Sequence, residues 1–398
     1  MRLPLPRTAM LGALLGLALA GCASSATSTY HPLTPTTTAG SAATSTPGDA
    51  TPSATPARPN TPTTTRVPST PTQPSSPGIP GALRVSGSHL VNASGATVRL
   101  RGVNYSGAEY ACIQGWGIWD GPSDDAMIAA IASWRTNTVR VLLNEDCWLG
   151  INGVQSQYGG AAYQKAIGDF IAKLAAHGLY AEVSLIWTAP GAAQATDQSP
   201  MPDADHSLAL WRSVASYLKN TPTVIFGAYG EPHDVDWLCW RDGGSACSVG
   251  YSAAGMQAIV NTIRGAGARQ PITVSGIDWA NDLSQWPQYR PSDPLGQLVA
   301  EFHQYGDNTC HDATCWNSQL APVAAQVPLV TSELGESVNG TCSSQFISSY
   351  MAWADAHGVG YLGWTWDTWG DCESLITDFN GTPTQGFGQG FKAHLMAS

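Results

Sequence analysis

The chain has 398 residues with a formal net charge of −11, and only 12% of its residues are charged. Because it carries no basic stripe, nucleic acid is not expected as a partner. The chain is also too long for most small folds, which leaves room for one large domain after any leader and linker.

The first residues predict export. A charged start is followed by an apolar stretch, residues 10–20, that is too short to span a bilayer stably. It ends in Leu19-Ala20-Gly21-Cys22, and small residues directly before a cysteine resemble the lipobox of bacterial lipoproteins. That resemblance implies a signal peptide over residues 1–21, and diacylation of Cys22 that anchors the chain at the extracytoplasmic face of the cell membrane. The alternative is a plain secretory signal with a coincidental cysteine, which also predicts export.

Residues 22–80 are predicted to be a disordered linker. They are rich in Thr, Pro, Ser and Ala and show no apolar periodicity. Such a segment cannot bury enough apolar surface to offset its ordering entropy. Frequent prolines should keep it extended, so we expect a semi-rigid spacer between the lipid anchor and residues 81–398.

Residues 81–398 are predicted to form a single α/β domain, a (β/α)8 barrel. Short β-branched runs alternate with helical patterns, and eight such units indicate a closed parallel barrel. We expect the strands at residues 98–104, 138–143, 180–187, 223–229, 272–277, 298–303, 329–333 and 360–366. Helices are expected at residues 124–134, 161–177, 205–218, 252–265, 319–325 and 344–357. A hairpin over residues 83–97 should plug or flank the barrel floor, and residues 281–297 have a poor helical pattern.

Two glutamates stand out because each follows one of these apolar runs. On this strand count Glu231 ends the fourth strand and Glu333 ends the seventh, so the two lie across the barrel mouth from each other. The carboxyl ends of the strands are where (β/α)8 barrels keep their chemistry. An acid paired with a nucleophile or base is what glycoside hydrolysis needs.

The cysteines predict disulfides rather than a metal site. If Cys22 is lipidated, eight of the nine cysteines remain, an even number in an exported domain. We expect the pairs Cys239–Cys247, Cys310–Cys315, Cys112–Cys147 and Cys342–Cys372, all in or near loops. Zinc is the alternative, but no C-x-x-C spacing is present, so no metal is expected.

Fifteen tryptophans accompany few charges. Flat indoles stack on sugar rings, and their N–H groups can bond to hydroxyls. Most of these tryptophans are expected in the core, and a minority in a sugar-binding cleft.

Several fragments in barrel order resemble the cellulase-like members of glycoside hydrolase family 5. Besides the two glutamates they are residues 100–104 (LRGVN), 137–141 (NTVRV), 302–305 (FHQY) and 363–367 (GWTWD). The resemblance covers nearly all of residues 83–395. It implies a retaining glycosidase that cleaves O-glycosidic bonds of a β-linked polysaccharide or oligosaccharide through a glycosyl-enzyme intermediate, with a carbohydrate as its partner and no cofactor. We expect a monomer.

The resemblance also assigns roles. Glu231 is expected to be the general acid and then the base, and Glu333 the nucleophile. Arg140 would keep the nucleophile ionised through a charge-assisted hydrogen bond. Tyr305 would donate to the nucleophile and His303 to a sugar hydroxyl.

Further residues are candidates for binding the sugar or for competing with the two catalytic glutamates. Trp366 is expected to floor the subsite of the cleaved sugar, with Trp364 as the alternative on the same strand face. Trp187 and Trp279 are expected as further sugar platforms. Glu336 is the competitor for the nucleophile, outside the strand register, and Glu145 and Asp146 are candidates for substrate binding.

The chain departs from the family at two positions. Gly230 stands where the family nearly always has an asparagine that bonds the sugar 2-hydroxyl, and Ile186 stands near the place of a common histidine. Both losses are expected on the same side of the pocket. A pocket that has lost these two polar side chains would suit a sugar with a substituent, an inverted 2-position or a furanose ring.

Two other functions use the same features. A non-catalytic carbohydrate-binding lipoprotein would explain the two departures, although a pure binder has no need of an acid and nucleophile pair. A transglycosylase would use the same residues as a hydrolase, and the sequence does not separate the two.

Overall fold

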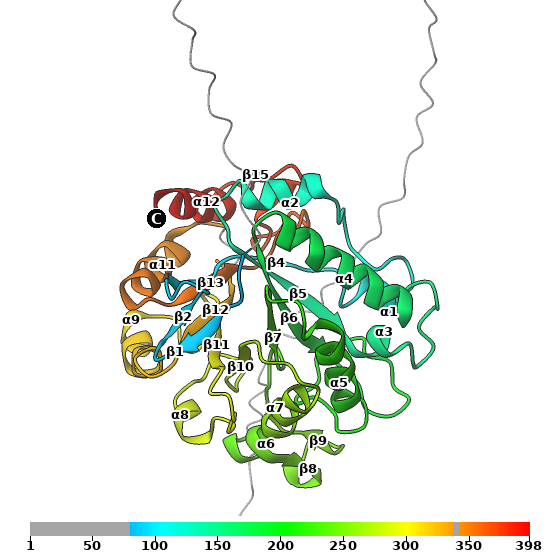
Figure 1. Cartoon of the computed structure of the whole chain (residues 1–398). Helices are drawn as coiled ribbons and strands as arrows, with labels where there is room; N and C mark the ends of the chain where they lie inside the picture. Colours follow the sequence, from blue (N-terminus) through cyan, green and yellow to red (C-terminus); the bar gives the residue numbers. More distant parts are fainter. Residues whose placement is uncertain (1–79, 337–341) are drawn as a thin grey trace, which may run out of the picture. The chain divides into compact units, whose positions relative to one another are not determined.

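The computed structural model describes residues 80–336 and 342–398. Eight parallel strands close into a barrel in the order β10-β11-β12-β13-β4-β5-β6-β7 (Figure 1). In chain order they are β4 (Arg101–Tyr105), β5 (Thr138–Asn144), β6 (Tyr180–Trp187), β7 (Val224–Gly227), β10 (Ile272–Ser275), β11 (Leu298–Gln304), β12 (Leu329–Leu334) and β13 (Gly360–Gly363). The (β/α)8 barrel predicted from the sequence is therefore confirmed.

The strands are buried along almost their whole length, which explains their apolar, β-branched sequences. Their register sets which side chains meet at the mouth. Arg140 pairs with Asn104 on one neighbouring strand and with Glu182 on the other. His303 pairs with Glu333 after a register shift that follows Phe302.

Helices cover the outside of the barrel (Figure 1). The longer ones are α2 (Asp125–Ala132), α4 (Ala161–Ala176), α5 (Ser207–Leu218), α7 (Met256–Gly265), α11 (Gln345–His357) and α12 (Phe387–Ala397). In α4 the buried residues Tyr163, Ile167 and Leu174 recur at helical spacing and face the strands. Asp124 caps α2 by accepting a hydrogen bond from the Met127 amide, which fixes where that helix begins.

Shorter elements lie in the connections. They are α1 (Ala111–Gln114), α3 (Glu145–Leu149), α6 (Trp237–Asp242), η1 (Ser245–Cys247), α8 (Trp286–Tyr289), α9 (Ala313–Cys315), the π-helical turn η2 (Trp316–Leu320) and α10 (Ala321–Ala324). The connection between β10 and β11 contains one short helix, the four-residue α8, in agreement with the poor helical pattern of that segment. Two small antiparallel pairs, β8 (Gly243–Gly244) with β9 (Ala253–Ala254) and β14 (Ile376–Asp378) with β15 (Thr382–Pro383), complete the connections.

A three-stranded antiparallel sheet closes the floor of the barrel. It comprises β1 (Arg84–Ser86), β2 (His89–Val91) and β3 (Thr97–Val98). Leu83 and Leu90 pack in one cluster with residues at the first halves of the barrel strands, among them Val299 and Val330. The predicted hairpin is confirmed, and it leaves the opposite end of the barrel open for a site.

Four disulfides brace the loops, and they have the four predicted pairings. They are Cys112–Cys147, Cys239–Cys247, Cys310–Cys315 and Cys342–Cys372. The first joins α1 to α3, after the first two barrel strands, and the last joins the segments that follow β12 and β13. The loops after four of the eight barrel strands are thus tied in pairs at the open end.

The predicted signal peptide, the lipidated Cys22 and the linker up to residue 79 lie outside the described residues. Within the part of the chain that the structure describes, no helix has both the length and the apolar character needed to cross a membrane.

Candidate active site

Glu231 and Glu333 meet at the open end of the barrel. Glu333 lies within β12, and Glu231 follows the end of β7 by four residues, because that strand stops at Gly227 and not at residue 229 as expected. One carboxylate oxygen of each glutamate and one ring nitrogen of His303 all lie within 4.8 Å of one another. The two carboxyl groups are therefore close enough to act on a single bond.

Glu333 is held by two donors. Nη1 of Arg140 lies 2.5 Å from its Oε1, and the Tyr305 hydroxyl donates to its Oε2 at 2.8 Å. Burial raises the pKa of Glu333 above its ordinary value, and the positive charges of His303 and Arg140 oppose that rise. Arg140 and Tyr305 thus have the contacts expected of them, and both stabilise the ionised carboxylate.

Glu231 is held by His303. Nδ1 of His303 lies 2.7 Å from Oε1 of Glu231, and Nε2 lies 3.3 Å from Oε1 of Glu301. The His303 side chain is only 1% exposed. It was expected to donate to a sugar hydroxyl, but that prediction is wrong, because both ring nitrogens face carboxylates.

Two buried carboxylates beneath the mouth were missed in the sequence. Glu301 on β11 and Glu182 on β6 are both fully buried. Glu301 accepts a hydrogen bond from Ser332 at 2.6 Å, and Glu182 accepts one from Thr273 at 2.7 Å. The sequence could have identified both residues, because each is a lone charged residue in an otherwise apolar strand, as Arg140 is.

Aromatic side chains lie at or after the ends of β6 and β10, the two strands that adjoin β7 in the barrel. Next to Glu231, the indole of Trp279 stacks on His233 with ring centroids 3.6 Å apart, and Trp279 is 45% exposed. At the end of β6, Trp187 is partly exposed and lies 6.1 Å from Tyr110. Trp187 and Trp279 are therefore accessible, as sugar platforms must be.

Tyr110 is the centre of a larger aromatic group that the sequence did not reveal. Trp116 lies 5.9 Å and Trp369 6.5 Å from it, and Trp369 lies 6.4 Å from Trp364. Trp116 is 43% and Trp369 36% exposed. These residues come from loops far apart in the sequence, so only the fold brings them together.

Trp366 is not a sugar platform. Its side chain is completely buried, with the ring edge-on to Trp134 at a centroid distance of 4.8 Å. The expectation assumed strand alternation through residue 366, but β13 ends at Gly363. Trp364 is the partly exposed member of the pair, and its side chain hydrogen-bonds to Glu373.

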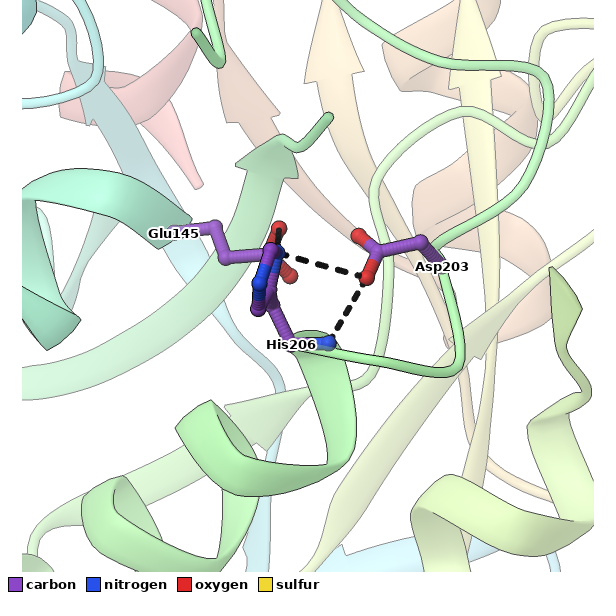
Figure 2. A group of neighbouring side chains, drawn as sticks. All are labelled: Glu145, Asp203 and His206. Carbon is purple, nitrogen blue, oxygen red and sulfur yellow. Dashed lines mark hydrogen bonds and ion pairs between the residues drawn. The ribbon is translucent and has the colours of Figure 1, made fainter. Parts of the chain in front are cut away.

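A second cluster of side chains able to offer ligand atoms lies in the loops after β5 and β6. Glu145, Asp203 and His206 point toward one another (Figure 2), with their donor atoms within 4.8 Å. Burial raises the pKa of Glu145 to about 10, helped by the nearby Asp203, so this carboxyl is protonated at neutral pH. Ser207 donates to Glu145, and Asp203 accepts from the His206 amide at 2.7 Å. These bonds fix the loop between β6 and α5.

Glu145 and Asp146 do not line the cleft, so their expected role in substrate binding is wrong. Both are fully buried. Asp146 accepts hydrogen bonds from the Ala195 amide and from Asn152, each at 2.9 Å. Asp146 therefore ties the loop after β5 to the loop after β6.

Glu336, the competitor for the nucleophile, has a structural role. It is fully buried and accepts hydrogen bonds from the amides of Phe346 and Ile347 at 3.2 and 3.0 Å. These amides belong to the first turn of α11, whose N–H groups need acceptors. Glu336 thus caps a helix and is not free to attack a substrate.

Gly230 and Ile186 adjoin each other beside the acid. A Cβ atom added at Gly230 would lie 3.1 Å from Cδ1 of Ile186 and 3.1 Å from Nη2 of Arg140. The isoleucine therefore fills the space that a side chain at position 230 would need. Gly230 and Ile186 thus form an apolar wall that adjoins Nη2 of Arg140 and directly precedes Glu231 in the chain.

Comparisons with known proteins agree with this geometry. The family model described as cellulase (glycosyl hydrolase family 5) matches residues 91–370. A mannan endo-1,4-beta-mannosidase of Streptomyces lividans is 25% identical over 309 residues, which cover 76% of this chain and 70% of that protein. Endoglucanase CelA of the same organism is 26% identical over 293 residues, which cover 72% of this chain and 56% of that protein.

Solved structures show the same fold. A β-glucanase from Saccharophagus degradans in complex with cellotetraose has a TM-score of 0.63 at 18% identity, over 81% of this chain and 95% of that one. The catalytic domain of a mannanase from Streptomyces sp. SirexAA-E has a TM-score of 0.57 at 22% identity, over 82% of this chain and 92% of that one.

Proposed function

Because the chain belongs to the cellulase family, glycosyl hydrolase family 5, and is a glycosidase acting on O-glycosyl compounds, we propose that it cleaves a β-linked polysaccharide or oligosaccharide with retention of anomeric configuration. The observation that carries this proposal is the approach of one oxygen of each carboxyl group to within 4.8 Å of the other. Retaining glycosidases place their carboxyl groups about 5 Å apart, whereas inverting ones need roughly 6.5–9.5 Å to admit a water molecule.

The proposed reaction has two steps. In the first, Glu333 attacks the anomeric carbon while Glu231 gives its proton to the departing glycosidic oxygen, which forms a glycosyl-enzyme. In the second, Glu231 takes a proton from water, and the resulting hydroxide equivalent displaces Glu333 from the sugar. Each carboxyl group returns to its starting state, so no cofactor is needed.

The environment of each glutamate fits its proposed role. Arg140 and Tyr305 bind both oxygens of Glu333, which favours a negatively charged nucleophile. Glu231 has the more exposed side chain, 12% against 4% for Glu333, as a group that must reach both a leaving oxygen and water should be.

The substrate class is supported by the exposed aromatic side chains in the loops at the open end of the barrel. Exposed indoles at Trp279 and Trp116 would stack on successive sugar rings of a chain. The β-glucan and β-mannan activities named for the relatives are consistent with such a chain. The apolar Gly230–Ile186 wall supports a sugar with a substituent, an inverted 2-position or a furanose ring in the cleaved position.

We propose further that the protein is exported and anchored to the membrane by lipid at Cys22, a position outside the described residues. Four disulfides are consistent with an oxidising compartment. Detergent-phase partitioning of the full chain tests this, because Cys22→Ser should move the protein to the aqueous phase. Equal partitioning of both forms would contradict the anchor.

The proposed activity is tested by one matched pair of variants on a glycan panel with product analysis. Glu333→Gln should lose turnover by several orders of magnitude and keep oligosaccharide binding, because only the attacking charge is removed. Glu336→Gln makes the same chemical change three residues away, at the cap of α11, and should lower stability while the folded enzyme stays active. Equal loss of turnover in both variants, or activity retained in Glu333→Gln, would refute the assignment.

A further inference from the structure

The imidazole of His303 lies between carboxylates on both of its ring nitrogens. Nδ1 faces Glu231 at 2.7 Å and also lies 3.4 Å from Oε2 of Glu333, while Nε2 faces Glu301 at 3.3 Å. An ionised carboxylate only accepts hydrogen bonds. Each nitrogen therefore needs a proton between itself and the oxygen it faces.

A neutral imidazole carries one N–H, so one of the two bonds must use an additional proton. If Glu301 is ionised, Nε2 carries the N–H that Glu301 accepts. The additional proton then lies between Nδ1 of His303 and Oε1 of Glu231. It makes either an imidazolium beside a carboxylate or a neutral imidazole beside a carboxylic acid.

The surroundings of Glu301 keep it ionised and fixed in place. Its Oε1 accepts the Ser332 hydroxyl at 2.6 Å and lies 3.5 Å from Nη2 of Arg140. Burial alone would raise the pKa of Glu301, but the bond from His303 and the charge on Arg140 hold it below its ordinary value. Among residues 80–336 and 342–398, no group bonds to its Oε2.

We propose that Glu301 is a positioning residue of the catalytic centre: it keeps a proton on Nε2 of His303 and so makes Nδ1 the atom that shares the catalytic proton with Glu231. This inference rests on the proposed role of Glu231 as the general acid. A buried carboxylate that fixes the tautomer of a histidine, which in turn serves a catalytic group, is the arrangement found in hydrolytic triads.

The proton balance of the reaction follows. Before bond cleavage, the pair of Glu231 and His303 holds one proton beyond the N–H on Nε2. That proton passes from Glu231 to the leaving oxygen, which leaves a carboxylate facing the unprotonated Nδ1 of a neutral ring, with no proton between them until the second step. In the second step the pair regains it from the attacking water. Glu301 accepts the Nε2–H throughout and changes its own protonation at no stage.

The charges that act on His303 come from its own strand β11, from the adjoining strand β12, from β5 and β6 across the barrel, and from the loop after β7. They are Glu301 on its own strand, Glu333 on β12, Glu231 after β7, and more remotely Glu182 on β6 and Arg140 on β5. Burial alone would lower the pKa of His303, but the carboxylates outweigh burial and raise it to about 10. Removing one of them should lower that pKa.

The experiment is a ¹⁵N NMR titration of labelled histidines in the full-length protein, together with pH profiles of kcat and KM. In the wild type, Nε2 of His303 should stay protonated across the neutral range. In Glu301→Gln, the His303 pKa should fall by at least about one unit, and the ring should lose its fixed Nε2–H form. We expect kcat to fall about 10- to 100-fold with KM changed less than about threefold, and the basic limb of the profile to move to lower pH.

Glu182→Gln is the matched control, because it makes the same chemical change in the same barrel interior, at a side chain that bonds to Thr273 and not to His303. Its His303 pKa should fall less than in Glu301→Gln, and Nε2 of the ring should stay protonated as in the wild type. If Glu301→Gln does not fold, Ser332→Ala removes the hydroxyl that holds Oε1 of Glu301 without touching the ring and should change the His303 titration. Unchanged His303 signals in the folded Glu301 or Ser332 variant would overturn the inference. If the His303 titration changes in the variants as expected but the wild-type protein has no glycosidase activity, the proposed function is refuted and the inference about Glu301 is not.

Discussion

Arg140 is the residue that balances the charge of the catalytic mouth. Its guanidinium is completely buried, and it reaches Glu333 at 2.5 Å, Asn104 at 3.1 Å and Ser184 at 3.2 Å. The charges of Glu333, Glu301 and Glu182 act on this guanidinium, so its loss leaves buried carboxylates without a counter-charge. The planar guanidinium serves several partners at once, which an ammonium group cannot do.

We predict that Arg140→Met moves the acidic limb of the activity profile to higher pH. The positive charge of Arg140 lowers the pKa values of Glu333 and Glu301, so its removal raises both and protonates the nucleophile at a higher pH. We also expect about a 100-fold loss of kcat, and destabilisation of about 3–5 kcal/mol because buried carboxylates are left unpaired. Arg140→Lys, which keeps the charge, should shift the limb less. An unshifted acidic limb in the folded Met variant would contradict this account.

Gly230 and Ile186 allow a prediction about packing. Gly230→Asn should be destabilised by about 1–3 kcal/mol, since its Cβ would lie only 3.1 Å from Ile186 and from Arg140. In the double variant with Ile186→Ala, much of this cost should be recovered, with a coupling of about 1 kcal/mol or more. Urea unfolding of the four proteins in the cycle measures it. Strictly additive effects would mean that the two positions are independent.

The role of a residue could be predicted from the sequence where the pattern of a single strand was enough to identify it. Arg140 was identified as a lone charge in an apolar run, and the same reasoning applies to Glu182 and Glu301. Their partners could not be predicted, because pairing across the barrel depends on register. His303 comes beside Glu333 only through a shift after Phe302, and no local pattern announces that shift.

At the scale of elements, the strands were predicted well and their ends less well. β4 begins at Arg101 and not at residue 98, because Val98 pairs with Leu90 in the floor sheet. β13 stops at Gly363, so the alternation assumed for Trp366 does not hold. Tertiary pairing decides where a strand ends, whereas propensity decides only that it exists.

The disulfides give a prediction at this scale. Cys112–Cys147 spans 35 residues and joins two loops at the open end, whereas Cys239–Cys247 spans eight. In the chain-entropy model, removal of the longer bridge by paired alanines should cost about 4 kcal/mol and removal of the shorter about 2–3 kcal/mol. Urea unfolding of the two double variants compares these costs. A larger loss from the shorter bridge would show that loop closure does not dominate.

At the scale of the whole domain, the barrel interior is apolar at its closed end and carries charged side chains nearer the mouth. Leu90, Val299 and Val330 fill the closed end, while Arg140 and Glu301 lie in the same barrel nearer the mouth. The alternation of strands and helices in the sequence predicted the architecture, because each unit must bury one face of its helix on the sheet. The aromatic group around Tyr110 could not be predicted, since its members come from loops that only the closed barrel brings together.

The central claim is that Glu231 and Glu333 act on one bond from carboxyl groups close enough for a covalent intermediate. Proton NMR of the first products, recorded during hydrolysis of the glycan that the panel identifies, tests it most directly. We predict that the newly released reducing end first appears with the anomeric configuration of the cleaved bond and then mutarotates. A first product of the opposite configuration would contradict this mechanism.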